Sequence, residues 1–230
     1  MQPVHNRPAL VLRPEPGNTA TCRAAQAHGL HTHAAPLFVY APRDWTLPDG
    51  PWAGLLIGSA AVFAHAGPAL SALRHIPVHA VGPTTARAAH AAGFTIAETG
   101  SGGLAPMVGA LPSGRYLRVA GEERVPLLPP PGVEVVDTVV YAARPLPLTQ
   151  GAIDLIRREA VLALLHSAQA ARHFAAQCTD LDLPRNTIAL ACLAPRIAQS
   201  AGENWQTVAI AARPDDEAML SLAQQMCQTV

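Results

Sequence analysis

Four short turns carry residue types that could bind an anionic ligand, and each turn follows an apolar run and precedes an alanine-rich segment. The turns are Gly58-Ser59-Ala60, Gly82-Pro83-Thr84-Thr85, His166-Ser167-Ala168 and Cys192-Leu193-Ala194. In an open parallel sheet, ligands bind beyond the carboxyl ends of the strands, where helix N-termini present unpaired N–H groups and a partial positive charge. The turns therefore predict a site for carboxylate or phosphate groups. Its candidate binding residues are Ser59, Ala60, Gly82, Thr84, Ser167, Ala168, Leu193 and Ala194.

The turns also have a purely structural interpretation. Ser59, Thr84 and Ser167 could each cap the helix that follows, which would stabilise that helix by about 1 kcal/mol. Against this, the turns come in matched pairs. The segment LLIGSAAVFAHAG resembles LLHSAQAARHFAA, and AVGPTTARAAHAAGF resembles LACLAPRIAQSAGENW, in the same order along the chain. The duplication predicts two similar units, each with turns of the same design.

The composition narrows the chemistry that these turns could perform. Hydrophobic residues make up 50% of the chain and aromatic residues 4%, which favours an α/β protein with parallel strands. The net charge is zero and there is no basic block, so neither a nucleic-acid partner nor a membrane partner is expected. All 16 basic residues are arginine, which excludes Schiff-base, pyridoxal-phosphate and Walker-loop chemistry, since each needs a lysine. An anionic ligand must therefore be bound by arginine or by backbone N–H groups.

The elements that position the turns alternate between strand and helix along the whole chain. The first unit of this kind has a strand at Ala9 to Leu12, a helix from about Asn18 with Asn18 or Thr19 as its N-cap, and Gly29 as its stop. Such alternation predicts right-handed crossovers and parallel sheets. We expect one discontinuous domain from residues 1–37 and 149–230 and a second from 50–137, with linkers at 38–49 and 138–148.

Two further residues are candidates for the site. Arg124, in the segment GEER, follows an expected strand and could point towards the ligand; a solvated start of a short helix over EERVPLLPPPG is the equal alternative. Tyr141 lies in the expected connection between the domains, where a packing role is the alternative. The four cysteines show no C-x-x-C spacing, so neither a zinc site nor a redox pair is predicted.

The ordered set of motifs resembles the uroporphyrinogen-III synthase family. The motifs are LVLRPEPG, LLIGSAAV, HAVGPTTARAAHAAGF, RVAGEER with LLPPPGVEVVDTVVYAA, LLHSAQAARHFA, and ACLAPRIAQSAG with a following W. The resemblance implies two flavodoxin-like α/β domains joined by a two-stranded connection, with the active site in a cleft between them. It also implies a monomeric hydro-lyase that cyclises hydroxymethylbilane, a linear tetrapyrrole, to uroporphyrinogen III. In this reaction the last pyrrole ring is inverted and water is lost, without a metal or other cofactor.

The resemblance also assigns roles to particular residues. Tyr141 corresponds to the tyrosine proposed as the general acid that assists departure of the hydroxyl, and Arg13, Ser59, Thr84 and Ser167 fall on cleft positions. The chain departs from the family pattern at CLAPR, where serine or threonine is common and only the N–H groups of Leu193 and Ala194 could serve. It departs again at His166, where the family residue is usually apolar or threonine-like.

Two other functions fit the same sequence. One is a two-domain binding protein that closes on an anionic small molecule, and the other is a catalytically degenerate family member kept for an interaction. The N-terminal segment MQPVHNRPALVLRPEPG lacks the features of a signal peptide, and no apolar run reaches the roughly 20 residues that span a bilayer. We therefore expect a cytoplasmic enzyme.

Overall fold

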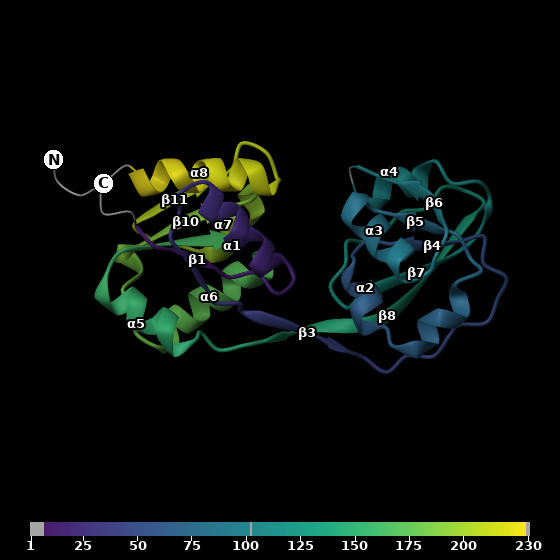
Figure 1. Cartoon of the computed structure of the whole chain (residues 1–230), viewed down its shortest axis with the longest axis horizontal. Coiled ribbons are helices and arrows are strands. Elements are labelled where there is room, and N and C mark those ends of the chain that lie inside the picture. The colour runs from purple at the N-terminus through teal and green to yellow at the C-terminus, as the bar shows by residue number, and fades with distance from the viewer. Residues whose placement is uncertain (1–6, 102, 229–230) are drawn as a thin grey trace. The chain divides into compact units, whose positions relative to one another are not determined.

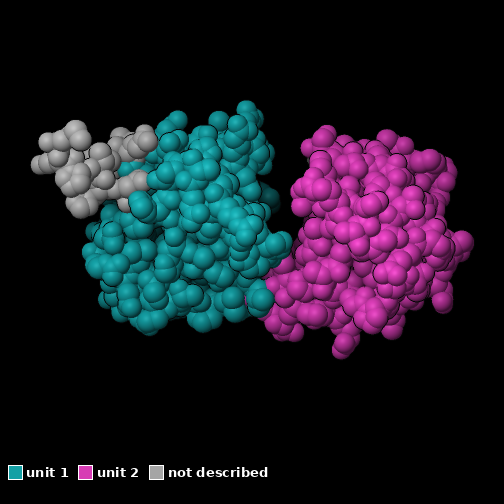
Figure 2. All heavy atoms as spheres, in the orientation of Figure 1, with its two compact units in different colours: residues 1–39, 145–230 teal, residues 40–144 magenta. Residues whose placement is uncertain are grey.

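A computed structural model describes residues 7–101 and 103–228 of the chain. The chain forms two compact units, which Figure 2 shows in different colours. Unit 1 comprises residues 1–39 and 145–230, and unit 2 comprises residues 40–144. Within the described residues, every helix is too short or too polar to cross a membrane.

Unit 1 is built on a five-stranded sheet in which all neighbouring strands are parallel. Its strands are β1 (Ala9–Val11), β2 (Thr32–Ala34), β9 (Val161–Leu165), β10 (Ile188–Cys192) and β11 (Thr207–Ile210). Their order across the sheet is β11-β10-β9-β1-β2. Numbered along unit 1, this is the 2-1-3-4-5 order of flavodoxin-like folds, in which the strand order reverses between β1 and β9. The helices, labelled in Figure 1, are α1 (Gly17–Ala27), α5 (Gln150–Arg158), α6 (Ala168–Asp180), α7 (Pro195–Ala201) and α8 (Asp216–Gln228), with a 3-10 turn η2 (Arg185–Thr187).

Unit 2 repeats this sheet with its strands in a circularly permuted order. The strands are β3 (Phe38–Pro42), β4 (Gly54–Ile57), β5 (Val78–Ala80), β6 (Ile96–Thr99), β7 (Gly114–Gly121) and β8 (Val133–Pro145), ordered β3-β8-β7-β4-β5-β6. The run β8-β7-β4-β5-β6 corresponds to β2-β1-β9-β10-β11 of unit 1. The helices are α2 (Ala61–His65), the 3-10 helix η1 (Pro68–Leu73), α3 (Pro83–Ala91) and α4 (Leu104–Gly109).

The chain passes between the units along β3 and β8, which both continue into the sheet of unit 2. The Arg43 N–H donates to the Val140 carbonyl and the Leu146 N–H to the Leu37 carbonyl, at 3.0 and 2.8 Å. Residue numbers thus rise along one strand as they fall along the other, so this pair is antiparallel. The expected linkers at 38–49 and 138–148 accordingly contain β3 and the second half of β8.

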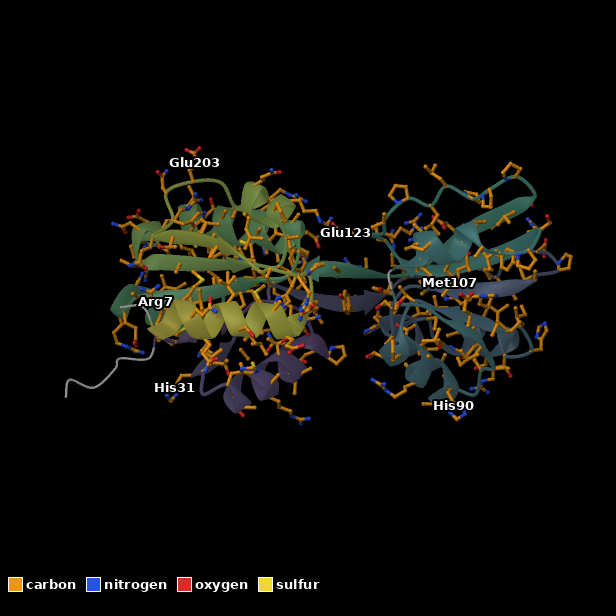
Figure 3. All side chains as sticks on the ribbon, turned by 90° about the horizontal axis from the view of Figure 1, so that it is seen from above. Arg7, His31, His90, Met107, Glu123 and Glu203 are labelled. Carbon is orange, nitrogen blue, oxygen red and sulfur yellow. The ribbon has the colours of Figure 1, made fainter. Side chains whose placement is uncertain are left out.

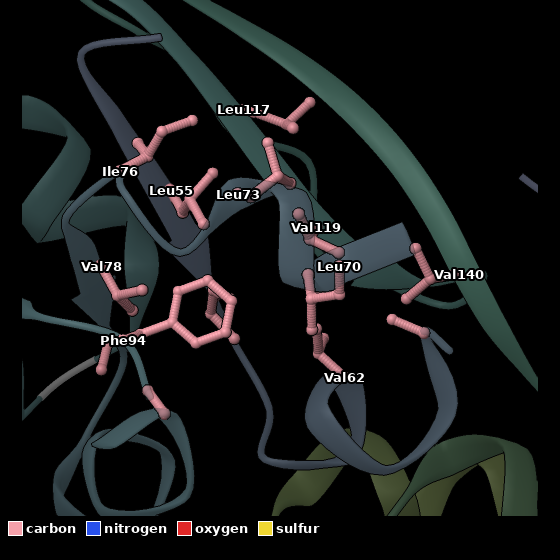
Figure 4. Close-up of a cluster of buried hydrophobic side chains, with 14 of the residues drawn as sticks. Leu55, Val62, Leu70, Leu73, Ile76, Val78, Phe94, Leu117, Val119 and Val140 are labelled. Carbon is pink, nitrogen blue, oxygen red and sulfur yellow. The ribbon is translucent and has the colours of Figure 1, made fainter. Parts of the chain in front are cut away.

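Apolar sequence runs place each sheet between layers of helices. Strands β9 and β10 are buried at every position, as expected for parallel strands covered on both faces. In unit 1, α1 and α8 pack on one face through residues such as Ala25, Met219 and Ala223. In unit 2, side chains of β4, β5 and β7 pack with Val62, Leu70 and Phe94, as Figure 4 shows.

The other face of the unit 2 sheet is covered more thinly. Leu56 and Tyr116 pack there against Val108 of the six-residue helix α4 and against Leu111, two residues beyond its end. Among the described helices of unit 2, α4 is the one that contributes to this cluster, whereas residues of α2, η1 and α3 belong to the other one. Leu127, from the irregular residues 122–132, also packs against the cluster. This incomplete cover leaves space beside the strand ends.

The predicted α/β class with parallel sheets is confirmed, and two local predictions are wrong. Helix α1 begins at Gly17, and Asn18 is a buried first-turn residue whose Nδ2 donates to the carbonyls of Val11 and Arg13. The Glu15 carboxylate accepts the Thr19 N–H at 3.1 Å. The side chain of Glu15, and not that of Asn18 or Thr19, therefore accepts a backbone N–H in the first turn of the helix. Gly29 has the expected left-handed backbone, with φ of 72°.

The short helix expected over EERVPLLPPPG is the second wrong prediction, because residues 122–130 contain no helix. Proline supplies no backbone N–H and clashes with the preceding turn, and this segment contains Pro126, Pro129, Pro130 and Pro131. The segment that follows β7 is therefore free to line a cavity rather than continue as a helix.

Candidate functional site

A cavity of about 450 Å³ lies at the carboxyl ends of the unit 2 strands β4 and β7. This is the place where the strand order of the sheet reverses, which is where open α/β sheets bind ligands. The described residues that line it include three of the predicted site residues, Ser59, Arg124 and Tyr141. The other lining residues are Gly58, Val81, Gly103, Leu104, Ala105, Arg118, Ala120, Gly121, Glu123, Val125 and Leu127.

Tyr141 is fixed in the cavity wall by its neighbours. It stands opposite Gly121 in the β7–β8 register, and a Cβ atom at Gly121 would lie 2.6 Å from the Tyr141 ring and 2.9 Å from its hydroxyl. The ring meets Tyr40 edge-on, with centroids 5.1 Å apart, and His65 at 5.9 Å. Glycine is thus required for Tyr141 to lie across β7, and the aromatic neighbours fix the position of its hydroxyl.

Arg118 is a buried cation that lines this cavity. It lies on β7 and its side chain is only 6% exposed. Its Nη1 is 3.8 Å from Asp137 Oδ1, and its Nε has no hydrogen-bond partner among the described residues. Burial lowers the pKa of the Arg118 guanidinium, as does nearby Arg124, while Asp137 opposes the shift. Burying a charge away from water costs several kcal/mol unless the charge is well paired. An apolar residue at position 118 would therefore be less costly to the stability of the sheet than this arginine.

Arg124 shares the same carboxylate. Its Nε donates to Asp137 Oδ2 at 2.7 Å, and its Nη1 donates to the Glu122 carbonyl at 2.9 Å. The Glu122 carboxylate is paired with Arg43. Glu123, labelled in Figure 3, lies on the same loop and is exposed. Two guanidinium groups in the cavity therefore share one carboxylate.

The remaining predicted residues of unit 2 lie along the same strand ends. The Ser59 hydroxyl oxygen accepts the Ala61 N–H at 3.2 Å, as in the capping alternative, which leaves its O–H as a donor. Gly82 precedes α3 with an extended backbone, and the Thr84 hydroxyl accepts a hydrogen bond from Arg87 rather than capping the helix. Ala60, Gly82 and Thr84 are not among the residues that line the cavity.

In unit 1, the corresponding strand ends hold an ion pair and a buried histidine. Arg13 follows β1, and its Nη1 donates to both carboxylate oxygens of Asp216 at 3.0 and 2.9 Å and to the Thr21 hydroxyl at 3.2 Å. A Cβ at Gly17 would lie 2.5 Å from Arg13 Nε, so the absence of a side chain there leaves room for the guanidinium. Arg13 is therefore held in place by the protein itself.

His166 lies beside this ion pair. Its side chain is 8% exposed, and its Nε2 is 3.6 Å from Asp216 Oδ1, which is longer than a hydrogen bond. Burial and the positive charge of Arg13 lower the pKa of His166 to about 4, against the opposing effect of Asp216. The ring is thus neutral at neutral pH, with one N–H donor and one acceptor.

The neighbouring turns of unit 1 differ in what they can offer a ligand. Ser167 caps α6 by accepting the Ala170 N–H at 3.1 Å, and Ala168 is the first residue of that helix. The Leu193 N–H donates to the Leu165 carbonyl at 3.0 Å, so this expected donor is already used within unit 1. In the segment CLAPR, the N–H of Ala194, the N-cap of α7, therefore remains as the candidate for binding a ligand.

Comparison with known proteins places the chain in one family. A family model described as uroporphyrinogen-III synthase HemD matches residues 19–221, which is most of both units. The chain belongs to the uroporphyrinogen-III synthase family. A search of curated proteins finds no significant match.

One solved structure of this family shares the fold of the chain. The chain is 18% identical to the uroporphyrinogen-III synthetase from Helicobacter pylori, with 96% of this chain and 99% of that chain covered and a TM-score of 0.64. It is 17% identical to the uroporphyrinogen III synthase from the extremely thermophilic bacterium Thermus thermophilus, with 96% of each chain covered and a TM-score of 0.39. At such identities the Helicobacter structure supports the fold alone.

Three polar residues at the strand ends of this synthase-family chain were missed by sequence reasoning. They are Arg118, Asp137 and Asp216. A signal existed for Arg118, which interrupts the apolar run of the strand YLRVA with a charge. Asp137 could have been found as its cross-strand partner only after β7 and β8 had been aligned. Asp216 is 203 residues from Arg13 in the sequence, and nothing local indicates that pair.

Proposed function

We propose that this chain cyclises hydroxymethylbilane to uroporphyrinogen III, with inversion of the last pyrrole ring and loss of water. The observation that carries the proposal is the family match over residues 19–221. The family is one of enzymes of tetrapyrrole biosynthesis, and the reaction makes it a lyase. A monomeric state and a cytoplasmic location stay predictions.

The reaction requires the protein mainly to hold the substrate in one conformation. As the terminal C–O bond of the substrate breaks, the hydroxyl leaves as water and the nitrogen lone pair of its pyrrole ring forms a cationic azafulvene. Without an enzyme, this cation closes to the symmetrical isomer. The enzyme must hold the chain in the conformation that leads to a spiro intermediate, and well-oriented intramolecular reactions gain many kcal/mol from such positioning.

Tyr141 is our candidate for the general acid. Its hydroxyl would give a proton to the departing hydroxyl, so that water leaves. The phenolate is then reprotonated by the proton that the last pyrrole ring loses when its carbon forms the closing bond. Supporting this, Tyr141 lines the unit 2 cavity, and the steric fit with Gly121 restricts where its hydroxyl lies. Our candidates for binding the substrate are the predicted strand-end residues Arg13, Ser59, Ala60, Gly82, Thr84, Arg124, Ser167, Ala168 and Ala194.

The test is an isomer analysis. The protein is incubated with freshly made hydroxymethylbilane, and the products are oxidised and separated. We expect the type III isomer in excess of that formed without protein. Only isomer I would reject the proposal, and tight binding without turnover would favour a binding protein or a degenerate family member.

A further inference from the structure

We propose that the unit 2 cavity binds one pyrrole ring of the substrate through a side-chain carboxylate that pairs with the Arg118 guanidinium. This inference rests on the proposed function, because it takes the acetate- and propionate-bearing pyrroles of the linear tetrapyrrole as the ligand. It assigns to Arg118 a binding role that neither the turns nor the family resemblance indicated.

The first argument is the state of Arg118 itself. Its side chain is only 6% exposed, yet its nearest carboxylate oxygen is 3.8 Å away and its Nε has no partner among the described residues. A buried guanidinium without good hydrogen bonds is strongly unfavourable. The guanidinium borders the cavity, and its Nη1, 3.8 Å from Asp137, is the donor that a ligand carboxylate would complete.

The second argument is the balance of charge. Asp137 is bonded to Arg124 at 2.7 Å, while its distance to Arg118 exceeds a hydrogen bond. The Glu122 carboxylate is paired with Arg43 and is therefore engaged elsewhere. Glu123 also lines the cavity, but it is exposed and makes no ion pair with Arg118 or Arg124 among the described residues. The two guanidinium groups that line the cavity thus have one closely placed carboxylate between them. A ligand carboxylate fits this imbalance, since arginine binds carboxylates with charged, paired hydrogen bonds.

The third argument is the apolar part of the cavity lining. Leu104 from α4 and Val125 and Leu127 from the loop after β7 line the cavity. Val125 is 67% exposed although it lines the cavity, and Leu128, the next residue after Leu127, is 92% exposed. A flat pyrrole ring would cover such side chains while its carboxylate reaches Arg118.

The size of the cavity sets how much of the ligand enters. Sites for small organic ligands run from roughly 300 to 1,000 Å³. At about 450 Å³ the cavity lies near the lower end of this range. It suits a part of the tetrapyrrole, such as a single ring with its acetate and propionate, rather than all of it.

The experiment compares two arginines of the same strand in the full-length protein. Arg115 also lies on β7 and also pairs with a carboxylate of β8, Glu134, but it is outside the cavity lining. We expect Arg118→Gln to raise KM for hydroxymethylbilane roughly ten- to a hundredfold, as for a lost hydrogen bond to a charged group. We expect Arg115→Gln to leave KM unchanged. Equal KM values for both variants and the wild type would overturn the proposal.

A second measurement needs no variant and does not depend on turnover. The wild-type protein is titrated with a monopyrrole that carries one acetate and one propionate, and the arginine Nε–Hε resonances are followed by NMR. We expect one buried arginine resonance to shift with the free acid and not with its methyl diester. An equal response to acid and diester, or none to either, would contradict carboxylate binding at Arg118.

The two proposals fail in different ways. If the wild type forms no type III isomer, the proposed function is wrong, whereas the monopyrrole titration still tests the cavity. If the wild type forms isomer III but neither KM nor the arginine resonance responds as expected, the cyclisation stands and the role of Arg118 is rejected.

Discussion

At the scale of residues, Tyr141 can reach the cavity only because residue 121 is glycine. Any side chain there would overlap the tyrosine ring, since a Cβ would lie 2.6 Å from it. Tyr40 and His65 hold the other side of the ring. The hydroxyl group is thus placed by packing, which is the condition for a group that must deliver a proton to one particular oxygen.

Removing this hydroxyl should slow the reaction without loosening the fold. We expect Tyr141→Phe to lower kcat by roughly 10- to 100-fold, at or just below the usual contribution of a general acid. The measurement is kcat for formation of isomer III, with thermal unfolding recorded on the same sample.

Tyr116→Phe is the matched control for this prediction. Tyr116 is also in unit 2, and its hydroxyl donates to the Pro112 carbonyl at 3.1 Å, away from the cavity lining. It should change stability slightly and leave kcat unaltered. An unchanged kcat in Tyr141→Phe would remove Tyr141 from the catalytic residues.

His166 should make the stability of the protein depend on pH. Its pKa is about 4 in the folded protein against an ordinary value of 6.5. Between these values the unfolded chain binds the proton and the folded protein does not, so stability present above pH 6.5 is lost as the pH falls to 4. The loss is at most about 3.5 kcal/mol, at about 1.4 kcal/mol per pKa unit.

Urea unfolding at pH 7, 6 and 5 measures this effect. The free energy of unfolding of His166→Leu should fall less across this range than that of the wild type. His90→Asn is the control, because His90 is exposed on α3. Identical slopes in the wild type and His166→Leu would show that His166 does not carry the pH dependence.

The candidate residues were found from the sequence to different degrees. Ser59, Arg124 and Tyr141 follow or lie within apolar strands at places the pattern marks, and the structure brings them to one cavity. Arg118 was missed because its importance depends on the cavity beside the strand ends. The sequence pattern of a strand does not show whether helices cover its sheet or leave such a cavity. The hydrogen bond from the Leu193 N–H to the Leu165 carbonyl was likewise not predictable from the turn, because it depends on the neighbouring strand.

At the scale of elements, Gln177 of α6 ties down the segment that leads from β8 into α5. Its Oε1 accepts the Leu148 N–H at 2.5 Å and its Nε2 donates to the Leu146 carbonyl at 3.2 Å. Gln177 is 9% exposed, so both bonds are largely shielded from water. One side chain thereby satisfies two backbone groups of an irregular segment.

Replacing this side chain should destabilise unit 1. We expect Gln177→Leu to lower the free energy of unfolding by roughly 1–3 kcal/mol, because a buried N–H loses its acceptor. Gln150→Leu, at an exposed position of α5, should change it by less than about 0.5 kcal/mol. Urea unfolding compares the two, and equal effects would mean that the contacts of Gln177 contribute little.

Most elements could be predicted because strand and helix periods alternate clearly along the chain. Strands such as VLALL and IALAC are apolar throughout and end at a polar turn or a Pro-containing turn. The two wrong predictions fall where other contacts or residues in the segment override the helix pattern. Asn18 is drawn into the interior by the carbonyls of Val11 and Arg13, and prolines prevent a helix in residues 122–130.

At the scale of the whole molecule, the duplicated motifs correspond to two sheets of one design. The equivalent strands β9 and β4 are each followed by a turn with a serine, Ser167 and Ser59, and both turns lie where the strand order of their sheet reverses. The circular permutation between the units could not be read from the motifs alone. It depends on which strands pair with β1 and β7, and this is a property of the folded sheet.

We propose that the strand-end loops of unit 1 and those of unit 2 both take part in binding the tetrapyrrole. Hydrogen–deuterium exchange of the intact protein, with and without uroporphyrinogen III kept reduced, tests it most directly. We predict slower exchange on ligand binding in residues 58–60, 82–84 and 121–127 and also in 13–17, 166–168 and 193–194. Slower exchange in only one of these two groups, or at the opposite ends of the strands, would contradict the claim.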